Sequence, residues 1–212
     1  MNNIQYKNPI KIISHDGYWG DKHTIKGIKK AQELGVWGIE EDIFERNGVI
    51  YLGEQDNGSN PTLQDALEIV DRTFIIDNTE GKIDVDLIQS VVKDKENIFI
   101  LTANKDDLIK IKGQCAWNTF EIQREDVDFY HITPKIRYYV LNPAWNINKD
   151  IIKSVNDTGA KLIPVCLSYN SPLTDRLLYP KVILMGHEYI MVDYIEDFIK
   201  YCNENDIPIW KT

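Results

Sequence analysis

The chain has 212 residues, of which 43% are hydrophobic, 10% aromatic and 27% charged. This length is typical of one α/β domain, and the apolar share is sufficient for a core, so we expect residues 1–212 to form a single ordered domain. The formal net charge of -9 disfavours nucleic acid and anionic membranes as partners, because affinity for polyanions depends on Lys and Arg.

The three cysteines, Cys115, Cys166 and Cys202, lie far apart in the sequence, which argues against a zinc site or a disulfide framework. The N-terminal segment is polar and shows no basic region followed by a continuous apolar stretch. No segment approaches the roughly 20 apolar residues that cross a bilayer as a helix. We therefore expect a soluble, cytoplasmic protein that does not insert into membranes. The sequence does not indicate its oligomeric state.

Short apolar runs alternate with amphipathic segments, which is the pattern of βα units around a mostly parallel sheet. In chain order, strands are expected at 11–14, 36–43, 73–78, 98–102, 136–142, 161–168 and 207–210. One of the segments 118–123 and 189–195 would complete a count of eight. Between the strands, helices are expected at 24–34, 62–70, 84–94, 105–111, 148–157 and 193–205. Several of these begin with an Asp, Asn or Thr that can cap a helix.

The segment VWGIEEDI ends in two acidic residues with one residue between them. Alternate side chains of a strand share a face, so Glu40 and Asp42 point one way while Glu41 points the other. Two carboxylates held this close repel each other, and a hard divalent cation relieves the repulsion because it prefers oxygen ligands. The spacing indicates a metal site, but a solvated junction between a strand and a loop has the same spacing.

Further motifs accompany this pair in roughly the first 80 residues. They are SHDG at 14–17, KKAQELG at 29–35, GIEED at 38–42, NG at 47–48 and PTLQDALEI at 61–69. In order and spacing they resemble the N-terminal half of the glycerophosphodiester phosphodiesterase family, and IPIWKT at 207–212 is similar to that family's late aromatic strand. The resemblance implies a compact α/β fold, a TIM (β/α)8-like barrel, and we expect its last strand to be altered or incomplete.

The resemblance also implies metal-assisted cleavage of a phosphodiester in which histidines move protons. His15 matches the family's first catalytic histidine, and Glu40 and Asp42 match its first two metal ligands. The third ligand of the family is a carboxylate on the third strand, where the inward positions of FIIDNTE select Asp77. The implied cofactor is a divalent metal, Mg²⁺ or Ca²⁺, and the implied partner is a small-molecule phosphodiester substrate.

Some departures from the family fall on residues that would bind the phosphate. Asp16 stands where the family has an arginine, and the family's Glu-Asn-Thr segment before the first helix is KHT at 22–24. A pocket without the arginine binds a phosphodiester less well, because guanidinium contacts to phosphate are strong. Lys22 and His23 are expected to replace part of this charge. We assign Asp16, Lys22, His23 and Trp210 to substrate binding, with Trp210 lining the barrel mouth.

Glu54 lies six residues after Gly48, where the family has its second catalytic histidine, and an offset of one would select Gln55 or Asp56. Glu54 is assigned as a catalytic residue, because a carboxylate with a raised pKa can act as a general base. A further metal ligand and a plain polar loop residue are the alternatives. Thr79 stands where the family has a basic residue.

These features favour a metal-dependent phosphodiester hydrolase acting on a glycerophosphodiester or a related sugar-phosphate diester, with His15 as general acid or base. Because Asp16, Glu54 and Thr79 depart from the family pattern, a catalytically impaired barrel that serves as a binding or regulatory module stays open. A third alternative is a lyase, in which a substrate hydroxyl attacks its own phosphorus and the product is a cyclic phosphate.

Overall fold

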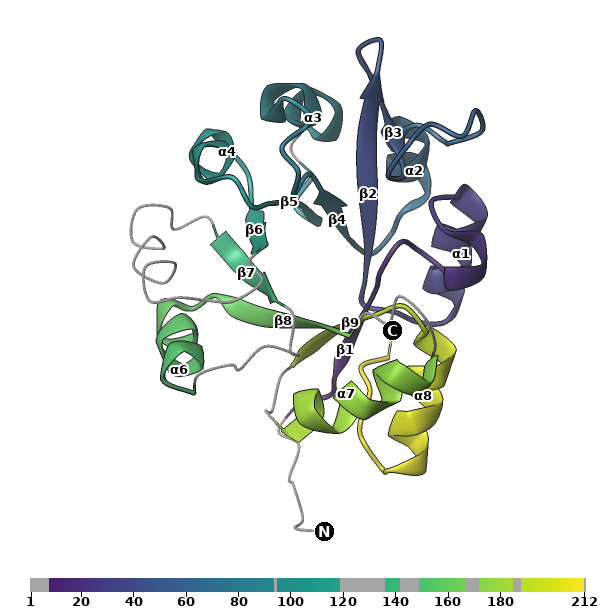
Figure 1. Cartoon of the computed structure of the whole chain (residues 1–212), viewed down its shortest axis with the longest axis vertical. Coiled ribbons are helices and arrows are strands. Elements are labelled where there is room, and N and C mark those ends of the chain that lie inside the picture. The colour runs from purple at the N-terminus through teal and green to yellow at the C-terminus, as the bar shows by residue number, and fades with distance from the viewer. Residues whose placement is uncertain are drawn as a thin grey trace.

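A closed ring of eight parallel strands forms the centre of the protein (Figure 1). The computed structural model describes residues 8–93, 95–118, 136–141, 149–166, 172–184 and 188–211. The ring strands are β1 (Lys11–Ser14), β2 (Gly38–Arg46), β4 (Thr73–Asp77), β5 (Ile98–Thr102), β6 (Cys115–Asn118), β7 (Ile136–Leu141), β8 (Lys161–Cys166) and β9 (Tyr189–Val192). Strand β1 pairs with both β2 and β9, which closes the ring. The protein therefore has the TIM-barrel-like α/β fold that the sequence predicts.

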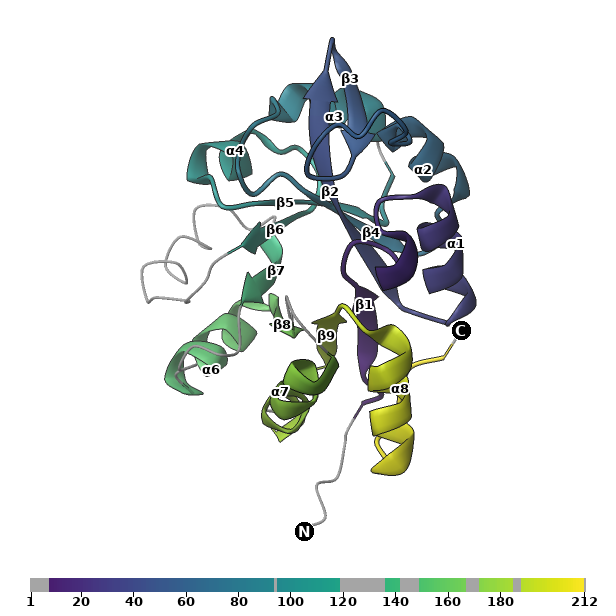
Figure 2. The ribbon, with the colours of Figure 1, turned by 45° about the vertical axis from the view of Figure 1, so that its right-hand side comes forward.

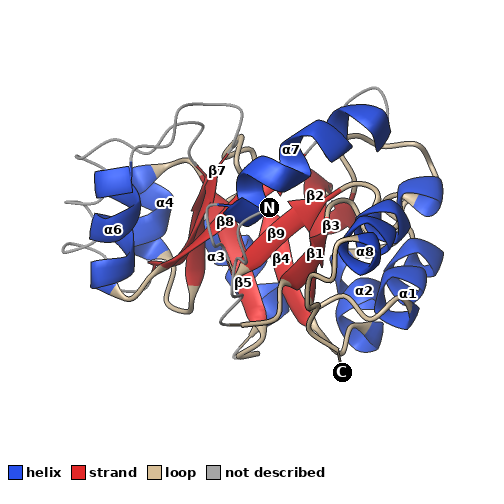
Figure 3. Ribbon diagram, turned by 90° about the horizontal axis from the view of Figure 1, so that it is seen from below, coloured by secondary structure: helices blue, strands red, loops and turns tan. Residues whose placement is uncertain are grey.

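Helices cover the outside of the ring (Figures 1 and 3). They are α1 (Ile25–Glu33), α2 (Leu63–Ile69), α3 (Val85–Val92), α4 (Lys105–Lys110), α6 (Lys149–Thr158), α7 (Pro172–Leu184) and α8 (Ile195–Glu204). Caps fix several starts: the Thr24 hydroxyl accepts a hydrogen bond from the Gly27 N–H at 3.0 Å, and Thr62 and Asp65 form a capping box. The 3-10 turn η1 (Trp19–Asp21) precedes α1.

Strand β3 (Val49–Leu52) lies outside the ring and pairs antiparallel with the end of β2. The turn between them has positive φ at Asn47 (54°) and Gly48 (78°), the backbone that a tight hairpin requires. In Figure 2 this hairpin projects from one end of the barrel. The loop that follows β3 is thereby placed beside the carboxyl ends of the ring strands.

Apolar side chains fill the barrel interior. The buried members of this cluster are Ile13, Ile75, Phe99, Leu101, Ala116, Tyr138, Val140, Ile163, Val165, Tyr189 and Met191. Its aromatic members gather towards the amino ends of the strands, where Trp37 packs on Tyr189 and Phe99 on Tyr138, each pair with ring centroids 4.9 Å apart. The interior is therefore closed by packed rings at the amino end, and polar side chains lie at the carboxyl end.

The structure corrects the expectation for the last strand. Residues 207–210 form no ring strand, because Tyr189–Val192 pairs with both β1 and β8 and occupies that place. Only an isolated bridge joins Ile209 to Ile10. The ring is complete, and of the two ambiguous segments it is 189–195 that supplies the strand. Most of 118–123 lies outside the described residues.

None of the helices among the described residues is long and apolar enough to cross a membrane.

Candidate active site

Strand alternation brings three carboxylates together at the carboxyl end of the barrel. Ile43 packs between the strands and the helices, so Glu40 and Asp42 of the same strand face the barrel interior. Ile75 lies in the interior cluster, so Asp77, two residues further along, faces inward as well. Asp42 and Asp77 are partners in the β2–β4 register. Glu40, Asp42 and Asp77 each place one oxygen within 4.8 Å of the other two.

His15 follows β1 directly and lies beside these carboxylates. Its Nδ1 is 2.9 Å from an oxygen of Asp193 and 3.2 Å from an oxygen of Asp16, and its Nε2 is 3.8 Å from Glu40 Oε2. When Nδ1 carries a proton and donates it to Asp193, Nε2 remains directed at Glu40. A carboxylate thus orients the imidazole, and its second nitrogen faces the candidate metal ligands.

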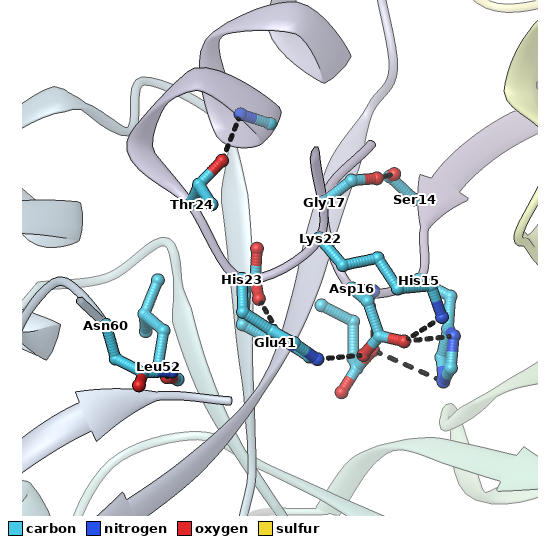
Figure 4. Close-up of polar contacts among 12 residues, drawn as sticks. Ser14, His15, Asp16, Gly17, Lys22, His23, Thr24, Glu41, Leu52 and Asn60 are labelled. Atoms are coloured by element: carbon cyan, nitrogen blue, oxygen red, sulfur yellow. Dashed lines mark hydrogen bonds and ion pairs between the residues drawn. The ribbon is translucent and has the colours of Figure 1, made fainter. Parts of the chain in front are cut away.

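Asp16 and Lys22 form an ion pair at the edge of the same cluster. The Lys22 ammonium is 2.6 Å from Asp16 Oδ2, and the Asp16 side chain is 2% exposed. The ammonium also lies 4.2 Å from the centre of the Trp19 ring, which packs against Tyr194 at 4.7 Å. Figure 4 shows Lys22 and His15 converging on Asp16. Lys22 therefore places an ammonium group beside the buried Asp16.

His23 lies between Asp16 and Glu41 (Figure 4). Its Nδ1 is 2.9 Å from Glu41 Oε2, and its Nε2 is 3.9 Å from Asp16 Oδ1. Glu41 is fully buried on the outer side of β2, the side that alternation predicts. Sequence reasoning missed Glu41 as a site residue, because the outward side of a strand gives no signal that a histidine from a loop will reach it.

Glu54 is exposed on the loop after β3. It lines a cavity of about 280 Å³ together with Asp42 and Asp77, and Lys82 lies at the same cavity. The structure therefore brings Glu54 to the side of the carboxylate cluster.

Trp210 lies away from this cluster. Its backbone N–H donates to the carbonyl oxygen of Ile10 at 2.9 Å, which places it at the amino end of β1, whereas His15 follows the carboxyl end. The structure does not bring Trp210 together with the other candidate residues. The expected position at the barrel mouth is wrong because residues 207–210 are not a barrel strand.

The candidate metal ligands have perturbed acidities. Burial raises the pKa of Glu40 well above its usual value, with His15 opposing the shift. Burial, reinforced by the charges of Asp16 and Asp77, raises the pKa of Asp42 to about 7. Burial also raises the pKa of Asp77, against hydrogen bonds from Thr79. These carboxylates are therefore crowded and poorly solvated, a condition that a bound cation relieves.

The pKa values of the two histidines are also raised, but for an imidazole a raised pKa favours the charged form. Burial alone would lower the pKa of His15, but the charge of Glu40 and hydrogen bonds to Asp16 and Asp193 outweigh burial and raise it well above its usual value. Burial would also lower the pKa of His23, but the contact with the Glu41 carboxylate outweighs burial and raises it. Both imidazoles are favoured in their protonated form while the surrounding carboxylates are ionised.

The carboxylate group fits a hard divalent cation. Glu40 Oε1 is buried and has no hydrogen-bond partner among the described residues, which is costly unless another ligand meets it. Oxygen donors from three carboxylates suit Mg²⁺ or Ca²⁺. Glu40, Asp42 and Asp77 are thus the residues that would hold the ion.

Asp193 is a further site residue that sequence reasoning missed. It follows β9 directly, and its side chain contacts His15 and lies 3.9 Å from the Lys22 ammonium. Its position just after a parallel strand is the available signal, because such residues meet at the carboxyl end of a barrel. That signal depends on recognising 189–192 as a strand, which the sequence leaves ambiguous.

The fold and the site together define a TIM-barrel-like protein with a carboxylate cluster at the carboxyl ends of its strands. The chain matches no protein-family model and no curated protein. Its fold is similar to that of a glycerophosphoryl diester phosphodiesterase from Parabacteroides distasonis ATCC 8503, with a TM-score of 0.75, 14% identity and coverage of 98% of this chain and 91% of that one. It is also similar to a glycerophosphodiester phosphodiesterase from Agrobacterium tumefaciens str. C58, with a TM-score of 0.66, 15% identity and coverage of 89% and 99%. At this identity the likeness concerns the fold.

Proposed function

We propose that this protein is a metal-dependent phosphodiester hydrolase that acts on a glycerophosphodiester or a related sugar-phosphate diester. The observation that carries the proposal is the approach of Glu40, Asp42 and Asp77 to within 4.8 Å of one another, with His15 Nε2 3.8 Å from Glu40. The fold shared with proteins named as glycerophosphodiester phosphodiesterases supports the substrate class.

In this proposal the three carboxylates hold one Mg²⁺ or Ca²⁺, which when bound supplies positive charge to a phosphoryl oxygen. The charge of Glu40 and the contacts with Asp16 and Asp193 favour the protonated form of His15, which can give a proton to the departing alcohol oxygen. The Asp193 contact fixes the ring and keeps Nε2 directed at the reacting group.

Lys22 is the proposed cation for the negatively charged diester. The Lys22 side chain is 30% exposed, and its ammonium contacts Asp16 and the Trp19 ring. A compact ammonium binds a phosphate oxygen as a point charge, without the bidentate geometry of an arginine. The cavity beside Asp42 and Asp77 is of a size that accepts a small alcohol group.

The test is turnover of a panel of glycerophosphodiesters with different headgroups, and of a chromogenic diester, with Mg²⁺, Ca²⁺ or Mn²⁺ present. We expect His15→Ala to lower kcat by about 10²–10⁴-fold, the usual contribution of general acid–base catalysis. Glu40→Ala should abolish metal-dependent turnover. The matched control is Asp71→Asn, which removes a carboxylate that is 66% exposed and outside the cluster, and it should behave as wild type.

Product analysis separates the alternatives. Hydrolysis in ¹⁸O-labelled water places the label in a phosphomonoester, whereas an internal attack releases an unlabelled cyclic phosphate. A protein that binds metal but cleaves no diester at any pH would contradict the proposed activity and favour a binding or regulatory module, a role consistent with Asp16 standing where the resemblance has an arginine.

A further inference from the structure

We propose that the barrel mouth holds a second metal ion, bound by Asp16, His23 and Asp42, next to the ion proposed at Glu40, Asp42 and Asp77. Asp42 is then a ligand of both ions. The inference rests on the proposed function only through this shared carboxylate, since the other ligands of the two sites differ.

The geometry of the three donors carries the proposal. Asp16, His23 and Asp42 each place one ligand atom within 4.8 Å of the other two. Asp16 is 2% exposed, and its Oδ1 is buried with no hydrogen-bond partner among the described residues. That atom faces His23 Nε2 at 3.9 Å, too far for a hydrogen bond, with Asp42 beside it. A buried carboxylate oxygen without a hydrogen-bond partner either binds a ligand or carries a large desolvation cost.

The remaining atoms of the same side chains are already engaged, which leaves the proposed donor atoms free. Asp16 Oδ2 pairs with Lys22, so Oδ1 points elsewhere. His23 Nδ1 contacts the buried Glu41 at 2.9 Å, so Nε2 is directed at Asp16. A carboxylate behind a histidine is how proteins fix the ring and tautomer of a metal ligand. Glu41 is therefore a positioning residue for His23.

Charge balance also favours a second cation. Six carboxylates meet here, and the basic side chains in contact with them are Lys22, His15 and His23, while Lys82 at the neighbouring cavity pairs with Glu80. The carboxylates are Asp16, Glu40, Glu41, Asp42, Asp77 and Asp193. The carboxylates outnumber these side chains, and a second divalent ion would reduce the excess of acidic groups.

The donor set predicts which metal binds. An imidazole nitrogen with two carboxylates suits Mn²⁺ or Zn²⁺ better than Ca²⁺ or Mg²⁺, whereas the all-oxygen site suits the harder ions. Two ions that share Asp42 would lie close together, and two-metal phosphate enzymes hold their ions about 3.5–4 Å apart. The expected state in Mn²⁺ is thus a magnetically coupled pair.

The test is the number of Mn²⁺ ions bound to the chelator-treated chain, measured by calorimetric titration and by the Mn²⁺ spectrum in electron paramagnetic resonance. We expect two ions per chain and a coupled-pair signal for wild type and for the control Asp71→Asn. His23→Gln and Asp16→Asn should each bind one ion and lose the coupled signal. Asp77→Asn should also bind one ion, because it removes a ligand of the other site.

The outcomes separate this inference from the proposed function. One ion in wild type that persists in His23→Gln and Asp16→Asn but is lost in Asp77→Asn overturns the second site and leaves the proposed site standing. Loss of an ion in His23→Gln with none lost in Asp77→Asn supports the second site and contradicts the first. Two ions in all variants, or none in wild type, overturns both.

Glu41→Gln provides a second measurement that does not depend on removing a ligand. Loss of a partner behind a metal-bound histidine costs about 10–100-fold in metal affinity. We expect that loss for the His23-containing site alone, with the affinity of the other site and the far-ultraviolet circular dichroism unchanged. Two ions bound to Glu41→Gln with wild-type affinities would overturn the positioning role of Glu41.

Discussion

The resemblance assigns an arginine to the position of Asp16 and a glutamate to the position of Lys22, so each position carries the opposite charge in this chain. Taken singly, each change removes a charge from its expected place, but the structure shows that the two side chains pair at 2.6 Å. The two positions therefore form an ion pair in this chain. Asp16 is its buried member and also contacts His15.

This coupling can be measured by a double-mutant cycle. Asp16→Arg alone places a buried cation against Lys22, and Lys22→Glu alone leaves Asp16 facing a like charge, so both should lower the free energy of unfolding. The double variant should recover about 1 kcal/mol or more relative to the sum of the single effects, since residues in one ionic network couple at that scale. Chemical denaturation measures the three values. Simple additivity would show that the pair makes no net contribution.

At the residue scale, strand alternation predicted that Glu40 and Asp42 share one face of their strand, and the resemblance, combined with the inward positions of FIIDNTE, selected Asp77. Alternation also placed Glu41 outward correctly but without a function, because its partner His23 comes from a loop whose path the sequence does not define. Asp193 was missed because β9 was ambiguous. Trp210 was assigned on the resemblance and lies at the other end of β1.

At the scale of elements, the segment joining β1 to α1 presents both Lys22 and His23. It depends on Gly27, where a Cβ atom would lie 2.2 Å from the carbonyl oxygen of Asp21. The Gly27 N–H also donates to the cap Thr24. Helix α1 and turn η1 can therefore pack this closely only with glycine at that position.

Gly27→Ala should destabilise the protein by roughly 1–3 kcal/mol, the usual cost of forcing atoms into a packed region. The matched control is Gly113→Ala, because a Cβ there meets nothing within 4 Å and the backbone shows no positive φ. That variant should be neutral or slightly stabilising. Thermal unfolding of the two variants tests the difference, and equal melting temperatures would contradict it.

Elements with clear periodicity were predicted, and elements without it were not. The strands at 11–14, 73–78 and 98–102 agree with the structure to within one residue. Helix α7 (Pro172–Leu184) was missed because it contains Pro180 and has apolar residues on all sides. Strand β6 (Cys115–Asn118) was missed because its sequence CAWN contains no β-branched residue, whereas KIIS of the equally short β1 contains two.

At the scale of the whole molecule, the barrel is apolar at one end and carries its buried charges at the other. Folding therefore forces several carboxylates into poor solvation. Burial raises the pKa of Glu41 and of Asp42 to about 7, above the value near 4 expected in an unfolded chain. Between these values the folded protein binds more protons than the unfolded one, so its stability falls as pH rises. The raised pKa values of His15 and His23 act in the same direction.

With a chelator present, we therefore expect the melting temperature to fall by several degrees between pH 5.5 and pH 8. For a chain of this size, each kcal/mol lost from the free energy of unfolding lowers the melting temperature by about 2–4 °C. Saturating Mg²⁺ or Mn²⁺ should restore it at pH 8, because an ion at 100 times its Kd adds about 2.7 kcal/mol. Glu40→Gln should show a smaller slope. A melting temperature that rises from pH 5.5 to pH 8 in chelator would contradict the charge crowding.

Anomalous X-ray scattering from crystals grown with Mn²⁺ shows whether three carboxylates from β2 and β4 bind a divalent cation beside His15. We expect an anomalous peak with Glu40, Asp42 and Asp77 as its ligands, and we expect this peak to be lost in crystals of Glu40→Gln. An absence of density there at saturating Mn²⁺, with His15 and the carboxylates in the places described, would contradict it.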